Sequence, residues 1–196
     1  MIDEPPAYPD YIGVSDVSTR SHEQMMVEMF MDGQPSCMAD EPLGFDIGDP
    51  PVLSGQSRGW TPVHYQLGAL ATCTSITIAV VANDFGFAYS WLRTGIRSLI
   101  DIRGFCDGDE ARKPEYELVE FDLMLDTDEP AERMEALAIE SDRRCPQLGL
   151  FHRAQIPMHV RWLRARDGTP VFEQRHHLGD GPTPAQTLAE DQAAAA

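Results

Sequence analysis

Positively charged residues are scarce in this chain of 196 residues. It has one lysine, Lys113, and its 15 lysines and arginines together face 32 aspartates and glutamates, which gives a formal net charge of -17. Nucleic acid and anionic membrane surfaces repel a protein surface of this sign, so we expect neither as a partner. The acidic excess predicts solubility and leaves the fold open.

The sequence also lacks the features that direct a protein into or across a membrane. Its first residues have neither the basic start nor the apolar stretch of a signal peptide. The longest apolar run, residues 67–82, is interrupted by hydroxyl residues such as Thr72 and Thr74, and it is too short to span a bilayer. We therefore expect a cytoplasmic protein, in which thiols are normally kept reduced. A cysteine pair in that setting is catalytic, metal-binding or inert rather than a permanent bridge.

Several motifs with a known chemistry are missing. There is no phosphate-binding loop ending in Gly-Lys-Ser or Gly-Lys-Thr, no Gly-x-Gly-x-x-Gly after a predicted strand, and no Gly-x-Ser-x-Gly. Nucleotide binding and α/β-hydrolase chemistry therefore have no support. No Cys-x-x-Cys or Cys/His ligand spacing is present, so we expect no metal site. We interpret His176 and His177 as a solvated surface pair and His152 as a structural residue.

The N-terminal part of the chain is rich in turn-forming residues. Residues 1–22 are expected to form an irregular arm, and residues 23–32 a strand of methionines and other soft apolar side chains. Residues 40–59 contain four glycines and three prolines, which indicates a loop.

A long helix is predicted to follow this loop. Pro62 suits the first helical turn, with Thr61 as N-cap, and the helix should run to about residue 84 and stop at Gly86. Because the helix is apolar nearly all round, we expect it to be buried at the centre of the fold.

The rest of the chain predicts two long strands, a second helix, a last strand and a tail. The second helix should begin after Thr127 or Asp128 and end at Pro146. The strands are predicted at 95–103, 115–126 and 156–166, and residues 176–196 should form a disordered tail. This order favours an α+β fold with an antiparallel sheet. One small sheet cannot cover a helix that is apolar on every side, so a second subunit is expected to do so.

Two cysteines stand in distinctive surroundings. Cys73 lies about three turns into the apolar helix, where a buried, inert thiol is the commoner case. At that distance the N-terminus of the helix does little to stabilise a thiolate, so Cys73 would need a nearby cation to become one. Cys145 follows Arg143 and Arg144 at the end of the second helix, which suits a thiol attacked late in a cycle better than one that attacks first.

Taken together, the two cysteine frames resemble the OsmC/Ohr family. The run from Pro62 through Leu67-Gly-Ala-Leu-Ala-Thr to Cys73 is similar to the Pro-x-x-Leu-Leu-x-Ala-Ala-Leu-x-x-Cys-Thr helix of that family. Arg144-Cys145-Pro146 is similar to its Cys-Pro at the end of the second helix. The resemblance identifies residues 23–175 as an OsmC-like domain.

The resemblance implies a fold and an activity. The fold is an intertwined homodimer, with antiparallel sheets around a long buried central helix and active sites at the dimer interface. The activity is thiol-dependent reduction of hydroperoxides, organic ones especially, with Cys73 as the peroxidatic thiolate and Cys145 as the resolving thiol. A sulfenic acid on Cys73 would be captured by Cys145 as a disulfide, which an external dithiol would reduce. The family's reaction requires no cofactor.

The chain departs from the family pattern where thiol activation is concerned. Peroxide-reducing members carry a glutamate one or two residues after the helix-opening proline, and here those positions hold Val63 and His64. The arginine that pairs with this glutamate also has no counterpart between Arg20 and Arg58. We therefore take Arg58 and His64 as substitute activating groups.

Two other interpretations compete with the peroxidase. The first is an OsmC-like dimer without peroxidase activity that binds a small apolar or sulfur-containing ligand at the same interface. The second is a structural dimer with two inert thiols. Thiol reactivity distinguishes them, because a peroxidatic Cys73 should have a lowered pKa and alkylate quickly below pH 7.

Overall fold

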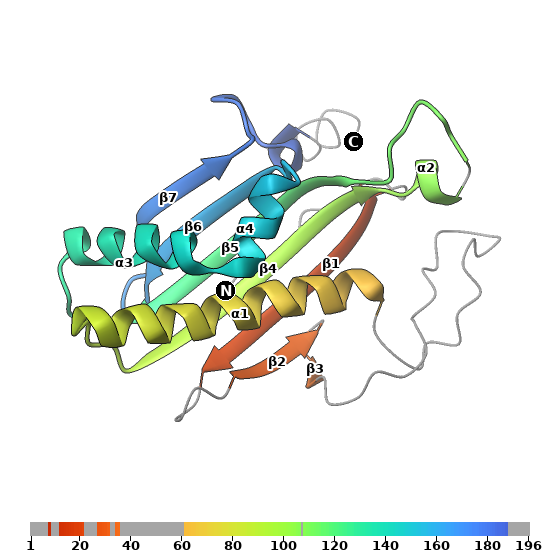
Figure 1. Ribbon diagram of the computed structural model, residues 1–196. Coiled ribbons are helices and arrows are strands. Elements are labelled where there is room, and N and C mark those ends of the chain that lie inside the picture. Colours follow the sequence, from red (N-terminus) through yellow and green to blue (C-terminus); the bar gives the residue numbers. More distant parts are fainter. Residues whose placement is uncertain are drawn as a thin grey trace.

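The computed structural model describes residues 8, 12–21, 27–31, 34–35, 61–106 and 108–187. Within them, one seven-stranded sheet has the order β3-β2-β1-β4-β5-β6-β7, and α1, α3 and α4 lie on one of its faces (Figure 1). The strands are β1 (Ile12–Ser21), β2 (Val27–Met31), β3 (Gln34–Pro35), β4 (Trp91–Asp101), β5 (Tyr116–Asp126), β6 (Met158–Arg164) and β7 (Pro170–His176). The helices are α1 (Pro62–Phe85), α2 (Arg103–Cys106), α3 (Ala131–Arg144) and α4 (Pro146–Arg153). The predicted α+β class is confirmed.

Adjacent strands are antiparallel in all the described pairings except that of β5 with β6. These two run parallel, with Val119 opposite Met158 and Leu125 opposite Arg164. The chain crosses between them through α3 and α4, because a parallel pair cannot be joined by a tight turn. The predicted antiparallel sheet is therefore wrong for this one pairing.

The long helix α1 forms the centre of the main apolar core. Leu67, Leu70 and Ile78 are fully buried and pack with Ile96 of β4 and Phe121 of β5. Burial of an aliphatic side chain of this size contributes about 1.5–3 kcal/mol. By length and composition α1 could also cross a membrane, but half of its apolar stretch is buried inside the fold. It is packed as the core helix of a globular protein.

Both ends of α1 lie where the sequence predicts. Thr61 is the N-cap, and its Oγ1 accepts the backbone N–H of His64 at 3.4 Å. Pro62 occupies the first turn. After Phe85 the chain turns at Gly86, which has the left-handed φ of 57° that glycine adopts without strain. The predicted helix is confirmed.

The irregular arm predicted for residues 1–22 is wrong for residues 12–21, which form β1 inside the sheet between β2 and β4. The side chains that β1 turns toward α1 include Ser15 and Thr19, both 3% exposed. Thr19 Oγ1 lies 2.6 Å from Thr94 Oγ1 and 3.2 Å from Ser75 Oγ, so its polar group is satisfied inside the core. A half-buried strand is recognised in a sequence by apolar residues at every second position, and here hydrogen-bonded hydroxyl residues occupy some of those positions. β2 lies within the predicted strand 23–32.

The helix after β5 differs in detail from the prediction. It begins at Ala131 with Pro130 in the N-cap position, whereas Thr127 donates its hydroxyl to the Ala88 carbonyl oxygen at 2.6 Å. Pro146 does end this helix, but it also opens α4, since proline is favoured at the first position of a helix. The predicted caps at Thr127 and Asp128 are therefore wrong.

The C-terminal region is more ordered than the sequence suggests. β7 was not predicted, and it pairs antiparallel with β6 at the sheet edge. The expected disordered tail is wrong for the part around Thr183 and Ala185, which are 2% and 6% exposed. Ala185 packs with Leu99 and Leu118 in a second apolar cluster, on the sheet face opposite α1. Residues 188–196 lie outside the described residues.

Candidate functional site

Cys73 and Cys145, which are 72 positions apart in the sequence, lie side by side in the fold. Their Sγ atoms are 3.8 Å apart, and both thiols are free. Cys73 is in the middle of α1 and half-buried, while Cys145 is 2% exposed. The predicted pair of thiols is thus close enough to form a disulfide after a small movement, once one of them has been oxidised.

The position of Cys145 follows from the break between α3 and α4. Its backbone N–H donates to the Ser141 carbonyl oxygen at 2.9 Å and closes α3, and its own carbonyl oxygen accepts the N–H of Gly149 at 3.0 Å in α4. Because Pro146 has no N–H to donate, the chain leaves one helix and enters the next at this residue. Both helices pack against α1, and the corner between them turns Cys145 toward Cys73.

The surroundings of Cys73 act on its pKa in opposing directions. Burial is the largest effect and raises the pKa, and the neighbouring thiol of Cys145 raises it further. The backbone N–H of Gln147 and the hydroxyl of Thr77 act to lower it. Gln147 lies in the first turn of α4, where unpaired N–H groups carry partial positive charge. In the single chain the net shift is upward, so the neutral thiol is favoured.

Two threonines of α1 line the thiol pair. Thr74 Oγ1 lies 3.4 Å from Cys145 Sγ, and Thr77 donates its hydroxyl to the Cys73 carbonyl oxygen at 2.9 Å. Thr77 shares the helix face of Cys73, as its i+4 spacing predicts. The pair therefore lies between an apolar core and a few hydroxyl groups.

The comparisons with known proteins agree with this arrangement. A family model described as OsmC-like protein matches residues 55–161, which is more than half of the chain and includes both cysteines. The chain belongs to the OsmC-like family. No curated protein matches it.

Solved structures show the same fold at low identity. An OsmC-like protein from Mycoplasma pneumoniae superposes with a TM-score of 0.51 at 13% identity, over 83% of this chain and 99% of that chain. An OsmC-like hydroperoxide resistance protein from Jannaschia sp. CCS1 superposes with a TM-score of 0.51 at 15% identity, over 71% of this chain and 85% of that one. At this identity the likeness establishes the OsmC-like fold alone.

Of the two predicted activating groups, only His64 lies in the described residues, and it is away from the thiols. His64 is 3% exposed in the first turn of α1, where its Nδ1 lies 2.7 Å from Thr61 Oγ1. It precedes Cys73 by nine residues, or about 13 Å along the helix axis. Arg58 lies outside the described residues, as does Cys37. Among the described residues of this OsmC-like chain, the Gln147 N–H and the Thr77 hydroxyl are the groups that lower the pKa of Cys73.

The arginines next to Cys145 are engaged on the surface. Arg143 donates to Glu140 at 2.6 Å and 2.7 Å, and Arg144 pairs with both Glu140 and Asp84. The two arginines lower the pKa of Glu140 to about 2. Both arginines therefore form ion pairs with carboxylates instead of contacting the Cys145 thiol.

Sequence reasoning missed the contribution of Gln147. Pro146 is the residue from which α4 could have been predicted, because a proline that ends one helix can also be the first residue of the next helix. A second helix at this point places its N-terminal N–H groups beside the thiol of Cys73.

Proposed function

We propose that this OsmC-like protein reduces organic hydroperoxides through Cys73 and Cys145. The observation that carries the proposal is the 3.8 Å separation of the two Sγ atoms, one from α1 and one from the corner between α3 and α4. A disulfide requires the sulfurs to approach to about 2.0 Å. A change of side-chain rotamer supplies that movement more readily than a change of fold.

The reaction is a two-step exchange at sulfur. The Cys73 thiolate attacks the outer oxygen of the hydroperoxide, the O–O bond breaks, and an alcohol leaves with Cys73 oxidised to the sulfenic acid. The Cys145 thiol then displaces hydroxide, which leaves as water, and a disulfide forms. An external dithiol reduces this disulfide and returns both thiols, and the cytoplasm is the compartment that supplies such reductants.

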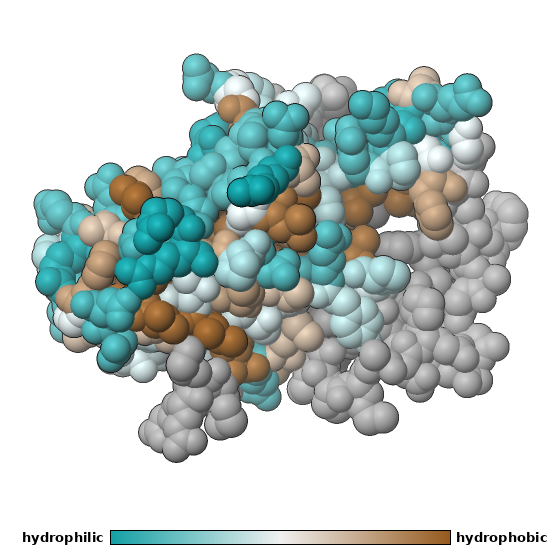
Figure 2. All heavy atoms as spheres, in the orientation of Figure 1, coloured by the Kyte–Doolittle hydropathy of each residue, from teal (hydrophilic) through white to brown (hydrophobic). Residues whose placement is uncertain are grey.

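A homodimer is part of this proposal. On the outer side of α1, Ile76 is 38% exposed and Val80 is 42% exposed. Figure 2 shows hydrophobic side chains gathered along this helix. The half-buried Cys73 lies three positions before Ile76 and seven positions before Val80. The three residues therefore share one face of the helix. A second subunit seated on this stripe covers the apolar side chains and approaches the thiol that needs a counter-charge.

A second candidate function is supported by the electrostatics of the site. The raised pKa of Cys73 is the opposite of what a fast peroxidatic cysteine needs, and Val63 and His64 stand where the family's activating glutamate is found. These features favour a dimer that binds a small apolar or sulfur-containing ligand beside the thiols without reducing peroxide.

Turnover of cumene hydroperoxide with a dithiol reductant distinguishes the two. We expect the wild type to consume the peroxide, Cys73→Ser to lose all turnover, and Cys145→Ser to react once but recycle poorly. Cys106→Ser is the matched control, since the proposed mechanism does not use Cys106, and it should retain full activity. A wild type that does not consume peroxide would exclude the peroxidase and leave the binding protein. A Cys73→Ser variant as active as the wild type would exclude the two-cysteine mechanism.

A further inference from the structure

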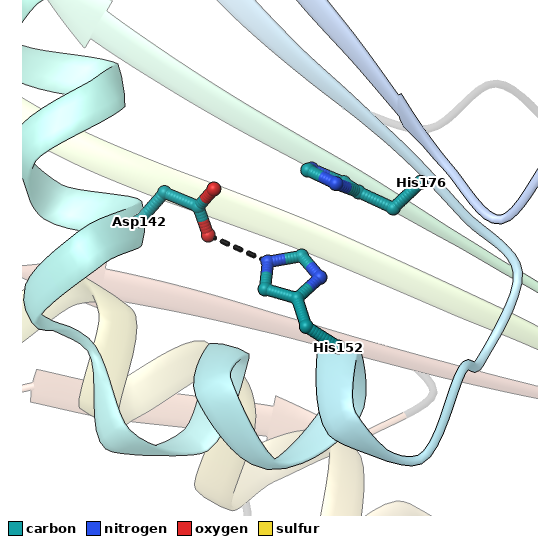
Figure 3. A group of neighbouring side chains, drawn as sticks. All are labelled: Asp142, His152 and His176. Carbon is teal, nitrogen blue, oxygen red and sulfur yellow. Dashed lines mark hydrogen bonds and ion pairs between the residues drawn. The ribbon is translucent and has the colours of Figure 1, made fainter.

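A second cluster of reactive side chains lies where α3, α4 and β7 meet. Asp142 comes from the last turn of α3, His152 from α4 and His176 from the end of β7, and their side chains converge (Figure 3). The candidate ligand atoms of the three residues all lie within 4.8 Å of one another. No two of these residues are close in sequence, so no spacing motif marks the cluster.

The contacts within the cluster leave two ring nitrogens unused. Asp142 Oδ1 lies 2.7 Å from His152 Nε2, and Gln174 donates its amide to Asp142 Oδ2 at 3.4 Å. The rings of His152 and His176 are 4.1 Å apart between centroids. Within the part of the chain that the structure describes, His152 Nδ1 and His176 Nε2 are buried and have no hydrogen-bond partner. Buried polar atoms without a partner are rare because they lose their hydration, so the unpartnered His176 Nε2 indicates a missing ligand. His152 would take part through its Nε2, the nitrogen beside Asp142.

We propose that Asp142, His152 and His176 bind one divalent transition-metal ion of the zinc class. Two imidazoles and one carboxylate are a donor set that zinc and its neighbours prefer, and calcium and magnesium do not. Zinc–ligand bonds of about 2.0–2.2 Å place ligand atoms roughly 3.3 Å apart in a tetrahedral site. The present cluster reaches this size by small side-chain rotations. Water completes the coordination.

The ion replaces a proton in this arrangement. The 2.7 Å contact between Asp142 and His152 holds one proton between a carboxylate and an imidazole, and metal binding releases it. Gln174 keeps its contact with the second carboxylate oxygen and orients the ligand, as outer hydrogen bonds do in metal sites. Side-chain exposures of 24% for His152 and 21% for Asp142 leave a path for the ion.

The site would link three elements around the resolving thiol. Asp142 precedes Cys145 by three residues and His152 follows it by seven, so an ion held by both closes the corner between α3 and α4. His176 connects this corner to the sheet edge. The inference does not depend on peroxidase activity, since the thiols are not among the ligands.

Zinc titration of the full-length chain, freed of metal with a chelator, tests the site. Isothermal titration calorimetry should give one Zn²⁺ per chain in the wild type and also in the Cys73→Ser/Cys145→Ser double variant, which has no thiol pair to bind the ion. Asp142→Asn and His176→Asn should each weaken binding about tenfold or more. Zinc should also raise the unfolding midpoint of the wild type.

His159→Asn is the matched control. His159 Nε2 pairs with Glu173 at 2.9 Å, so it has the same imidazole–carboxylate contact outside the cluster, and its loss should leave zinc affinity unchanged. Circular dichroism of each variant checks the fold, and His176→Asn at the end of β7 carries the test if Asp142→Asn does not fold. Absence of binding by the wild type, loss of the site in the cysteine double variant, or wild-type affinity in His176→Asn would overturn the proposal.

Discussion

The reactivity of Cys73 is set by a balance between burial and the first turn of α4. Burial and the thiol of Cys145 raise its pKa above the ordinary value, and the N–H of Gln147 and the hydroxyl of Thr77 act against them. A lowered pKa was expected of Cys73 if it is peroxidatic, and the direction in the single chain is the opposite. Because the thiolate is the nucleophile, the reactive fraction then increases about tenfold per pH unit below the pKa.

Alkylation of Cys73 should therefore accelerate steadily with pH. Iodoacetamide labelling of the wild type, followed by mass spectrometry of the peptide that contains Cys73, should give rates that rise about tenfold per unit from pH 6 to pH 8. The urea-unfolded protein is the control, and its cysteines should react faster at every pH in this range. A rate that is already constant below pH 7 would mean that another group, such as Arg58 or a partner subunit, lowers the pKa of Cys73.

Thr61 is a second residue whose role is local. It caps α1 by accepting the His64 N–H and lies against the His64 ring, and it is 3% exposed. Thr61→Ala should lower the free energy of unfolding by about 1–2 kcal/mol, since it removes the cap and leaves an imidazole nitrogen without this partner. Thr61→Ser keeps the hydroxyl and should lose much less. Urea denaturation measures both, and equal stability of Thr61→Ala and wild type would contradict the capping role.

At the scale of elements, a helix or strand could be predicted from the sequence when the residues that specify it are adjacent in the chain. α1 is specified by adjacent residues, namely a capping threonine, a proline, an apolar run and Gly86, and the prediction is confirmed. β1 is specified by partners far along the chain, because the buried Thr19 is stable in the core only when the hydroxyls of Ser75 and Thr94 meet it. β7 lies at a sheet edge with few buried side chains, so its pattern is weak.

The end of β4 gives a pH-dependent prediction. Asp101 accepts hydrogen bonds from the backbone N–H of Arg103 at 3.1 Å and from its Nε at 2.9 Å, and Arg112 lies 3.9 Å away. The hydrogen bond from the Arg103 side chain is the main reason why the pKa of Asp101 lies below its usual value, although burial acts to raise it. A carboxylate whose pKa is lower in the folded state stabilises the fold above the unfolded-state pKa, near 3.9, and this contribution is lost as the pH falls through the folded-state pKa.

Asp101→Asn should therefore flatten the acid dependence of stability. Urea denaturation between pH 6 and pH 3 should show the wild type losing stability more steeply than the variant, with the largest difference in stability at pH 6. Asp109→Asn is a suitable control, since the Asp109 side chain is 41% exposed and lies 4.0 Å from Arg112. Parallel pH profiles for wild type and Asp101→Asn would show that the Arg103 pair does not couple to folding.

At the scale of the whole molecule, the sequence predicted the thiol pair but missed what surrounds it. Cys73 and Cys145 each lie in a recognisable local frame, so their meeting followed from the family resemblance. The cluster of Asp142, His152 and His176 has no such frame. His176 was interpreted as a solvated surface residue, yet it packs against the ring of His152, because β7 brings it there and β7 itself was not predicted.

Subunit association is the last property to be tested at this scale. Ile76 and Val80 form an exposed apolar stripe on the central helix α1, and in the proposed dimer a second copy of the protein would gain the free energy of covering it. Sedimentation equilibrium of the wild type should give twice the chain mass of 21.8 kDa. Ile76→Asp should shift the protein to the monomer, because an unpaired carboxylate would be buried at the interface.

Ile139→Asp is the matched control for the association experiment. Ile139 is 52% exposed on α3, outside the stripe, and its replacement introduces the same charge at a site where we expect no contact with the partner. This variant should remain a dimer. Because Cys73 shares the helix face of Ile76, the monomeric Ile76→Asp variant should also change the rate of Cys73 alkylation, whereas Ile139→Asp should not. A wild type of 21.8 kDa at micromolar concentration, or dissociation by Ile139→Asp alone, would contradict an interface on α1.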